Sequence, residues 1–319
     1  EGRIAIFEPS DTNYRNYDDY SFYVTTWNNQ ELTAPTQAGS YEVRYYDKNE
    51  TLITSNTLEV IATTAGLTIP DSVEAGYAFS LDFSGPEGRI AIFEPSDTNY
   101  RNYDDYSFYV TTWNNQELTA PTQAGNYEVR YYDDNEGLLV SRSLEVRPTT
   151  ATITAPDSIE AGYAFSLDFS GPEGRIAIFE SGDTDYRNYD DYSFYVTTWN
   201  DKELTAPTQA GSYEIRYFDE NSGLLTSIPL TVTPTTATLN LPSEVTAGAA
   251  FSFSFSGPDG RIAIFEVDDA NHRNYNTYSF YVTSWNDISL TAPEQAGTYA
   301  VRYFDGNEGL LVSQTITVR

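Results

Sequence analysis

The chain has 319 residues, enough for two to four ordinary domains, and a net charge of −30 at pH 7. This charge argues against nucleic acid and anionic membranes as partners, because their phosphates would be repelled. The sequence contains no cysteine, which excludes disulfides, thiolate metal sites and a cysteine nucleophile. It contains no methionine either, so we expect a processed or interior segment of a longer array. No apolar run approaches 18 residues, so we expect no direct membrane insertion.

A repeat of 86 residues organises the chain. The stretch GRIAIFE begins at Gly2, Gly88, Gly174 and Gly260, and residues 1–39 are identical to residues 87–125. Such a period is too long for a solenoid and matches one small domain. A catalytic site is normally present once in a chain. A feature copied in every repeat therefore indicates a structural building block, or a binding surface whose effect depends on the number of copies.

Each repeat reads as a series of strands. In the second copy, Tyr77, Phe79, Leu81 and Phe83 alternate with small and polar residues, which predicts a half-buried strand over residues 77–84. Further strands are predicted at residues 88–93, 106–113, 125–133 and 139–146. Together with the segment from about residue 64, roughly seven short strands fall in each repeat, the pattern of an immunoglobulin-like β-sandwich. No segment has a helical period.

A tyrosine follows a turn that contains proline and glycine, at the start of a late strand in each repeat. Sandwiches of this class often carry a tyrosine there whose hydroxyl bonds to the backbone a few residues upstream. The candidates for this tyrosine corner are Tyr41, Tyr127, Tyr213 and Tyr299. The alternative is that these residues are ordinary core aromatics.

The stretches ATITAPDSIEAGYAFSLDFSGPEGRIAIFE, LTAPTQAGSYEIRYFD and SIPLTVTP resemble the tandem Ig-like repeats of large secreted or surface-anchored bacterial proteins, some of which also carry von Willebrand A domains. The resemblance covers the whole chain and implies an extracellular spacer or adhesive role, with no chemistry of its own. The long insert SDTNYRNYDDYSFYVTTWN departs from that family, in which we expect a shorter loop with glycine.

The predicted domains follow from a start near TAGLTIPDSVEAG. Repeats 2, 3 and 4 are then complete Ig-like units, and repeat 1 lacks its first strands; the ranges are 1–63, 64–148, 149–234 and 235–319. The linkers IATTAG, RPTTAT and TPTTAT leave little slack. We therefore expect all-β tandem sandwiches arranged end to end as an elongated rod, whose partners are neighbouring repeats and other copies of the chain.

Catalysis is not expected. The single histidine, His272, has no Ser-His-Asp arrangement or zinc set around it in the sequence, and acidic residues are spread evenly over the repeats.

Calcium binding is an open alternative for the acidic loops, because carboxylates on irregular loops suit Ca²⁺. The competing interpretation is a solvated acidic loop, since the spacing matches no specific calcium motif. The candidate ligands in repeats 2 and 3 are Glu94, Asp97, Asp104, Asp105, Glu180, Asp183, Asp190 and Asp191.

Tyrosines dominate the insert. Rings beside Asn and Asp suit stacking on sugars, but they also suit protein contacts, or a second small core formed where the insert folds over the sandwich. The candidate binding residues are Tyr100, Tyr103, Tyr106, Tyr186, Tyr189 and Tyr192.

Two functions remain open from the sequence. The first is a structural segment of an extracellular or cell-surface bacterial fibre, stalk or adhesin, which acts as a spacer or filament. The alternative is a multivalent glycan- or protein-binding module that uses the Tyr-rich acidic loop of each repeat.

Overall fold

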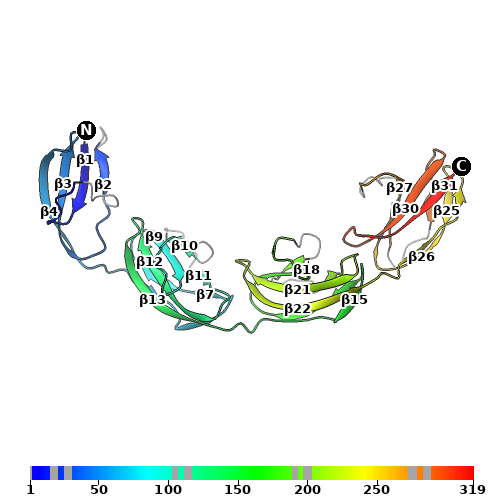
Figure 1. Ribbon diagram of the computed structural model, residues 1–319, viewed down its shortest axis with the longest axis horizontal. Helices are drawn as coiled ribbons and strands as arrows, with labels where there is room; N and C mark the ends of the chain where they lie inside the picture. The colour runs from blue at the N-terminus through cyan, green and yellow to red at the C-terminus, as the bar shows by residue number, and fades with distance from the viewer. Residues whose placement is uncertain are drawn as a thin grey trace. The chain divides into compact units, whose positions relative to one another are not determined.

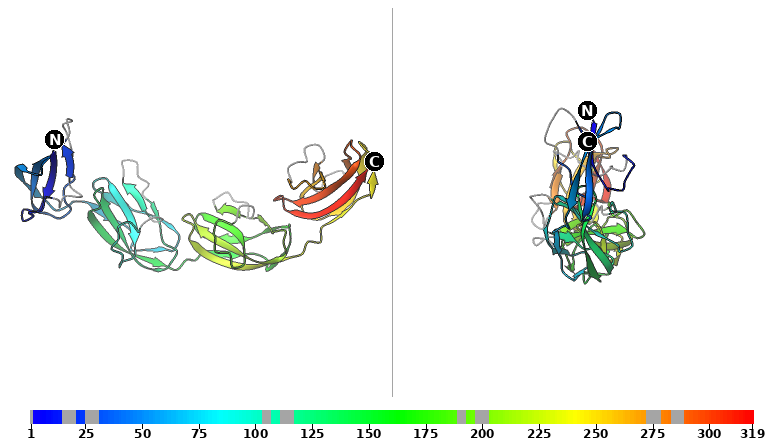
Figure 2. Two further views of the ribbon diagram at one scale, coloured as in Figure 1. Left: turned by 45° about the horizontal axis from the view of Figure 1, so that its top comes forward. Right: turned by 90° about the vertical axis from the view of Figure 1, so that its left-hand side faces the viewer.

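The computed structural model describes residues 2–14, 21–24, 31–102, 107–110, 117–188, 193–196, 203–271, 279–282 and 289–319. Every regular element within these ranges is a β-strand (Figure 1, Figure 2), which confirms the predicted all-β class. No helix that could span a membrane occurs in this part of the chain. The chain divides into two compact units, Glu1–Thr149 and Thr150–Arg319. The predicted domain boundaries stay predictions, although the one at 148/149 lies one residue from this division.

Repeat 1 forms one antiparallel sheet of four strands in the order β2-β1-β3-β4. The strands are β1 (Gly2–Phe7), β2 (Ser21–Val24), β3 (Gly39–Asp47) and β4 (Leu52–Val60). These strands correspond to the later strands of the repeat pattern.

Repeat 2 is a sandwich whose larger sheet has five strands in the order β10-β9-β12-β13-β6. The strands of this sheet are β6 (Ser72–Glu74), β9 (Gly88–Phe93), β10 (Ser107–Val110), β12 (Gly125–Asp133) and β13 (Leu138–Arg147). Strand β6 runs parallel to β13, and the other pairs are antiparallel. Opposite lie two strand pairs, formed by β5 (Gly66–Thr68) with β8 (Asp82–Ser84) and by β7 (Ala78–Ser80) with β11 (Glu117–Thr119).

The second unit contains the same arrangement twice. The strands of repeat 3 are β14 (Thr152–Thr154), β15 (Ser158–Glu160), β16 (Ala164–Ser166), β17 (Asp168–Ser170), β18 (Gly174–Glu180), β19 (Ser193–Val196), β20 (Glu203–Thr205), β21 (Gly211–Asp219) and β22 (Leu224–Thr233). The strands of repeat 4 are β23 (Thr238–Asn240), β24 (Glu244–Val245), β25 (Ala250–Ser252), β26 (Ser254–Ser256), β27 (Gly260–Glu266), β28 (Ser279–Val282), β29 (Ser289–Thr291), β30 (Gly297–Asp305) and β31 (Leu310–Val318).

The strand predicted over residues 77–84 is in fact two strands, β7 and β8. They are interrupted at Leu81, and each pairs with a different partner strand. The alternation still holds, because Phe79 and Leu81 point into the core with exposed fractions of 8% and 3%. The apolar pattern therefore identifies the inward face correctly, while strand pairing decides where the ladder breaks.

The core of repeat 2 lies between the two layers. Ile90 and Val129 of the larger sheet are fully buried, and so is Tyr131. The Tyr131 hydroxyl donates a hydrogen bond to the carbonyl of Pro86 in the turn before β9. A Cβ atom on Gly85 would lie 2.8 Å from this hydroxyl oxygen, so the turn requires glycine where it passes the tyrosine ring.

The tyrosine corner is present in all four repeats. The hydroxyl of Tyr127 donates to the carbonyl oxygen of Gln123 at 3.0 Å, four residues upstream. The equivalent bonds run from Tyr41 to Gln37, from Tyr213 to Gln209 and from Tyr299 to Gln295, at 3.1, 3.0 and 3.2 Å. This bond and the strand order identify tandem immunoglobulin-like sandwiches.

Candidate functional site

The outer face of the five-stranded sheet carries a second, small apolar cluster in repeat 2. Because successive side chains of a strand point to opposite faces, Ala91 and Phe93 of β9 lie beside Tyr132 of β12 on the side away from the core. The Phe93 and Tyr132 rings meet edge to face at 5.8 Å between centroids. Tyr100, from the start of the insert, packs on this cluster at 6.1 Å from Tyr132. The insert therefore begins by covering part of the outer face.

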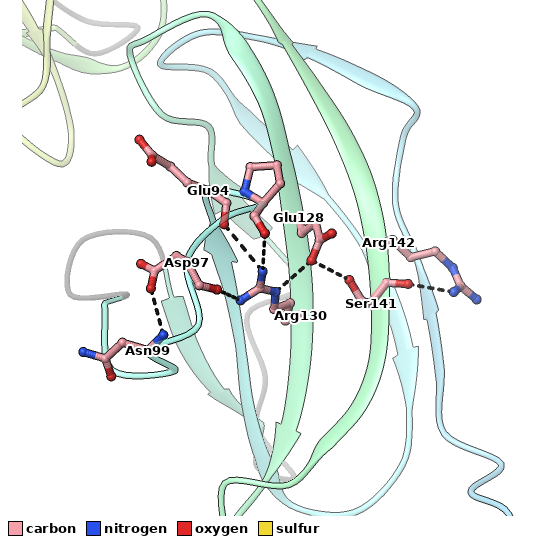
Figure 3. A network of polar contacts seen from close by, with 8 residues as sticks. Glu94, Asp97, Asn99, Glu128, Arg130, Ser141 and Arg142 are labelled. Atoms are coloured by element: carbon pink, nitrogen blue, oxygen red, sulfur yellow. Dashed lines mark hydrogen bonds and ion pairs between the residues drawn. The ribbon is translucent and has the colours of Figure 1, made fainter.

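Arg130 ties the loop after β9 to this face (Figure 3). Its guanidinium is buried and lies over the Phe93 ring, 4.9 Å from the centroid. It donates to the carbonyl oxygens of Asp97, Pro95 and Glu94, with the last two at 3.4 and 3.5 Å. Its Nε forms an ion pair with Glu128 at 2.8 Å. One buried cation thus binds three backbone carbonyls of the loop.

The same clamp recurs in every repeat, which makes it part of the module. Arg44, Arg216 and Arg302 donate to the carbonyls of Asp11, Asp183 and Asp269 respectively. Arg44 and Arg216 also pair with Glu42 and Glu214, each at 2.9 Å. Ala300 takes the position of this glutamate in repeat 4, so the carbonyl bonds and not the ion pair are common to all four copies.

The predicted calcium ligand Asp97 is bonded within its own loop. One carboxylate oxygen accepts from the Asn99 backbone N–H and the other from the Asn102 side-chain amide, both at 2.8 Å. These bonds, from Asn102 first and Asn99 second, hold the pKa of Asp97 below its ordinary value. Asp183 has the same bonds from Asn188 and Asp185, and its pKa is lowered in the same way.

The other predicted calcium ligands divide into two groups. Glu94 and Glu180 are exposed at the ends of their strands. Asp104, Asp105, Asp190 and Asp191 lie outside the described residues. Within the described ranges, no group of three His, Asp or Glu side chains is placed to hold a metal ion. The calcium interpretation therefore stays an untested prediction.

A hollow of about 390 Å³ lies beside the aromatic cluster of repeat 2. Its main lining residues are Arg89, Tyr100, Tyr109, Tyr132, Asp134 and Glu136. The guanidinium of Arg89 covers one face of the Tyr109 ring at 3.8 Å from the centroid. Arg101 lies over Tyr100 and forms an ion pair with Glu136 at 3.2 Å. The hollow thus combines aromatic rings with charged groups of both signs.

Repeat 3 carries an equivalent hollow of about 180 Å³. Its main lining residues are Arg175, Tyr186, Tyr195, Phe218, Glu220 and Ser222. Arg175 lies over the Tyr195 ring at 4.0 Å and donates a hydrogen bond to its hydroxyl. Tyr186 packs on Phe218 with a centroid distance of 6.5 Å, as Tyr100 packs on Tyr132. The same construction therefore occurs in both compact units.

The turn after β12 places an acidic side chain at the hollow of repeat 2. Glu136 has φ 68°, a left-handed backbone conformation that residues other than glycine rarely adopt. Asp133 supports this turn, because its Oδ1 accepts from the backbone N–H groups of Asn135 and Gly137 at 2.9 and 2.7 Å. Ser222 occupies the same position in repeat 3 with φ 65°.

Of the predicted tyrosines, Tyr100 and Tyr186 line the two hollows. Tyr103, Tyr106, Tyr189 and Tyr192 lie outside the described residues. Sequence reasoning did not identify Arg89, Tyr109 or Glu136. The signal that could have found the first two is the strand alternation itself, which puts them on the face opposite the core residues Ile90 and Val110.

Comparison with known proteins yields structural similarity only. No family model and no curated protein matches the chain. The N-terminal eight Ig domains of Down Syndrome Cell Adhesion Molecule match all of this chain at 14% identity and TM-score 0.21, and the chain spans half the length of that structure. Sidekick-1 immunoglobulin domains 1–4 match at 12% identity and TM-score 0.21, with coverage of 99% of this chain and 90% of the other.

A bacterial structure is also similar. It is the Bacteroides ovatus mixed-linkage glucan utilization locus protein SGBP-B in complex with a mixed-linkage heptasaccharide, at 16% identity and TM-score 0.20, with coverage of 81% of this chain and 71% of the other. The identification of Ig-like sandwiches rests on the strand order and tyrosine corner and not on these low scores.

Proposed function

We propose that the chain is a structural segment of an extracellular bacterial fibre, stalk or adhesin, in which rigid sandwiches act as a spacer. The observation that carries this proposal is the construction of the linkers. Strand β13 ends at Arg147 and β14 begins at Thr152, while β22 ends at Thr233 and β23 begins at Thr238. The four intervening residues can span at most about 14 Å when fully extended.

The linker that leaves repeat 3 is also tied down by hydrogen bonds. The backbone N–H and the hydroxyl of Thr236 both donate to the Glu160 carboxylate, the latter at 2.7 Å. Strand β15, which carries Glu160, is itself paired in parallel with β22. Within the linker, the Ala237 N–H donates to the Thr235 hydroxyl oxygen at 3.1 Å. These bonds reduce the freedom that four residues would otherwise have.

The linker between repeats 1 and 2 contains the same local turn. The Ala65 N–H donates to the Thr63 hydroxyl oxygen at 3.0 Å, as Ala237 does to Thr235. The recurring Thr-Thr-Ala sequence thus serves as a stiffening device. A spacer needs no catalytic group.

Small-angle X-ray scattering of the full chain tests this proposal. A compact protein of 319 residues would have a radius of gyration of about 20 Å, whereas four units of about 35–45 Å in line give about 40–52 Å. We expect a radius in the larger range, at several protein concentrations. Inserting ten Gly-Ser residues after Pro234 should broaden the distance distribution. A radius near that of a compact protein would contradict the spacer proposal.

A further inference from the structure

We propose that the hollows of repeats 2 and 3 each bind a ring of a neutral, β-linked hexose polymer. This inference goes beyond the spacer role and rests on a different part of the molecule, the outer face of the five-stranded sheets. The two binding platforms are the rings of Tyr109 and Tyr195.

Each platform is exposed and held in place. Tyr109 and Tyr195 are 66% and 64% exposed, so most of each ring is open to solvent. One ring face is covered by the guanidinium of Arg89 or Arg175, at 3.8 and 4.0 Å. The cation orients the ring and leaves its other face for a ligand, so little side-chain entropy is lost on binding.

The apolar faces of a pyranose match such a ring. A β-linked hexose presents at least one flat C–H face, even where one hydroxyl is axial as in galactose and mannose, and its other hydroxyls point outward from the edge. Stacking on Tyr109 would bring these hydroxyls to the polar rim of the hollow, where Glu136 and Arg101 form their ion pair. A few polar groups around aromatic rings are the usual composition of a small-ligand site.

The turn that follows β12 in repeat 2 and β21 in repeat 3 places further oxygen atoms at each hollow. Its left-handed residue is Glu50, Glu136, Ser222 or Glu308, with φ between 65° and 68°, so this conformation belongs to the hairpin of every repeat. In repeats 2 and 3 the residue concerned is Glu136 or Ser222. Both put an oxygen-bearing side chain at the hollow, a carboxylate in one copy and a hydroxyl in the other.

Charge selects a neutral polymer. Acidic residues outnumber arginines in both linings: Asp133, Asp134 and Glu136 stand against Arg89 and Arg101 in repeat 2, and Glu173, Asp219 and Glu220 against Arg175 in repeat 3. The net charge of the whole chain is −30. Polyuronates, sulfated glycans and nucleic acids would be repelled before they reached the tyrosines. Repeats 2 and 3 each carry such a hollow, and a polymer offers many copies of the same ring, which compensates for weak individual sites.

Affinity electrophoresis of the full chain tests the proposal, in gels that contain barley β-glucan, a β-galactan, a β-mannan or polygalacturonate. We expect retardation by at least one of the three neutral polymers and none by polygalacturonate. The double variant Tyr109→Ala/Tyr195→Ala should lose at least about tenfold in apparent affinity. The matched control is Ser80→Ala/Ser166→Ala, two exposed residues at equivalent positions of the smaller sheets, and it should bind as the unaltered chain does.

The proposal is overturned if no neutral polymer retards the chain, if the double tyrosine variant is retarded equally, or if only polygalacturonate retards it. Self-association that disappears in the tyrosine variant, without polymer binding, would instead assign the hollows to contacts between copies and would also overturn it. Circular dichroism establishes that both double variants are folded. Neither the presence nor the absence of polymer binding alters the scattering expected of the single chain without polymer, so the two proposals fail separately.

Discussion

Repeats 1 and 2 place the same residues in two different environments. Ile4, Val43 and Tyr45 of repeat 1 are half-buried, whereas their equivalents Ile90, Val129 and Tyr131 are fully buried. The difference is the strands between residues 64 and 84, which supply Leu67, Phe79 and Leu81 as a second layer in repeat 2. Equivalent strands of closely similar sequence thus pair in the same order in both repeats, and the second layer is what buries their inner face in repeat 2.

The outer face does not share this difference. Arg44 and Arg130 are both 7% exposed, and both donate to three carbonyls of the following loop. The clamp therefore depends on one sheet only. The inner and outer faces of the sheet are therefore stabilised independently, and the following predictions test this independence.

The largest expected effect is on the inner face. Ile90→Ala should lower the free energy of unfolding of repeat 2 by about 2–5 kcal/mol, because it leaves a cavity in a closed core. Ile4→Ala in repeat 1 should cost under about 2 kcal/mol, because half-buried atoms gain less from burial. Hydrogen exchange in urea, followed by mass spectrometry, would measure both losses of stability. Peptides from residues 1–39 and 87–125 are identical in the unaltered chain, and the substitution gives one of them a different mass. Equal losses would refute the comparison.

Loss of the arginine clamp should destabilise repeats 1 and 2 equally, unlike loss of the inner isoleucine. Arg130→Met and Arg44→Met should each destabilise their own repeat by about 2–4 kcal/mol, because three carbonyls lose their donor. We expect the two losses to agree in the same exchange measurement. Ser141→Ala, which removes only a bond of 3.2 Å to Glu128, is the control and should change stability little. A loss in repeat 2 alone would show that the clamp needs the second layer.

The tyrosine corner is a local device and should also give equal effects. Tyr127→Phe and Tyr41→Phe each remove one hydroxyl that is bonded to a backbone carbonyl four residues upstream. The expected loss is about 0.5–1.5 kcal/mol in each repeat. Urea denaturation monitored by the same exchange experiment would detect it. A null effect in both would mean that the hydroxyl bonds equally well to water.

Acid should weaken the loops of repeats 2 and 3. The pKa values of Asp97 and Asp183 are lowered in the folded state by amide donors, so their stabilisation is complete above the unfolded value of about 3.9. It is lost as the pH falls through the folded pKa values. We expect a falling thermal midpoint below about pH 4. The Asp97→Asn/Asp183→Asn variant should show a smaller fall, and an identical pH profile would contradict this assignment.

Chelation should have the smallest effect. The described oxygens of the Glu94–Asp97 loop already accept hydrogen bonds from Arg130 and the neighbouring amides. We therefore expect the same thermal midpoint in EDTA and in millimolar Ca²⁺. A rise with Ca²⁺ that saturates would instead support the calcium interpretation, because a ligand that binds only the folded state raises its stability.

Local patterns were sufficient for much of the fold. Alternation identified the inward face of residues 77–84, and a tyrosine after a Pro- and Gly-containing turn identified the corner at Tyr127. Both signals lie within ten residues of chain. The break at Leu81 was not predictable in this way, because it depends on which distant strands pair on either side.

The amino-acid sequence by itself determined the repeat, the longer strands and their inward faces, and it named the candidate tyrosines of the corner. The strands, their faces and the corner depend on residues close together in the chain. Only the tertiary structure decided where the outer residues meet. Arg89, Tyr100, Tyr109 and Glu136 come from two strands, the insert and a turn, and share one hollow only when β9, β10 and β12 lie side by side. The physical reason is that strand pairing, unlike alternation, joins residues far apart in the chain.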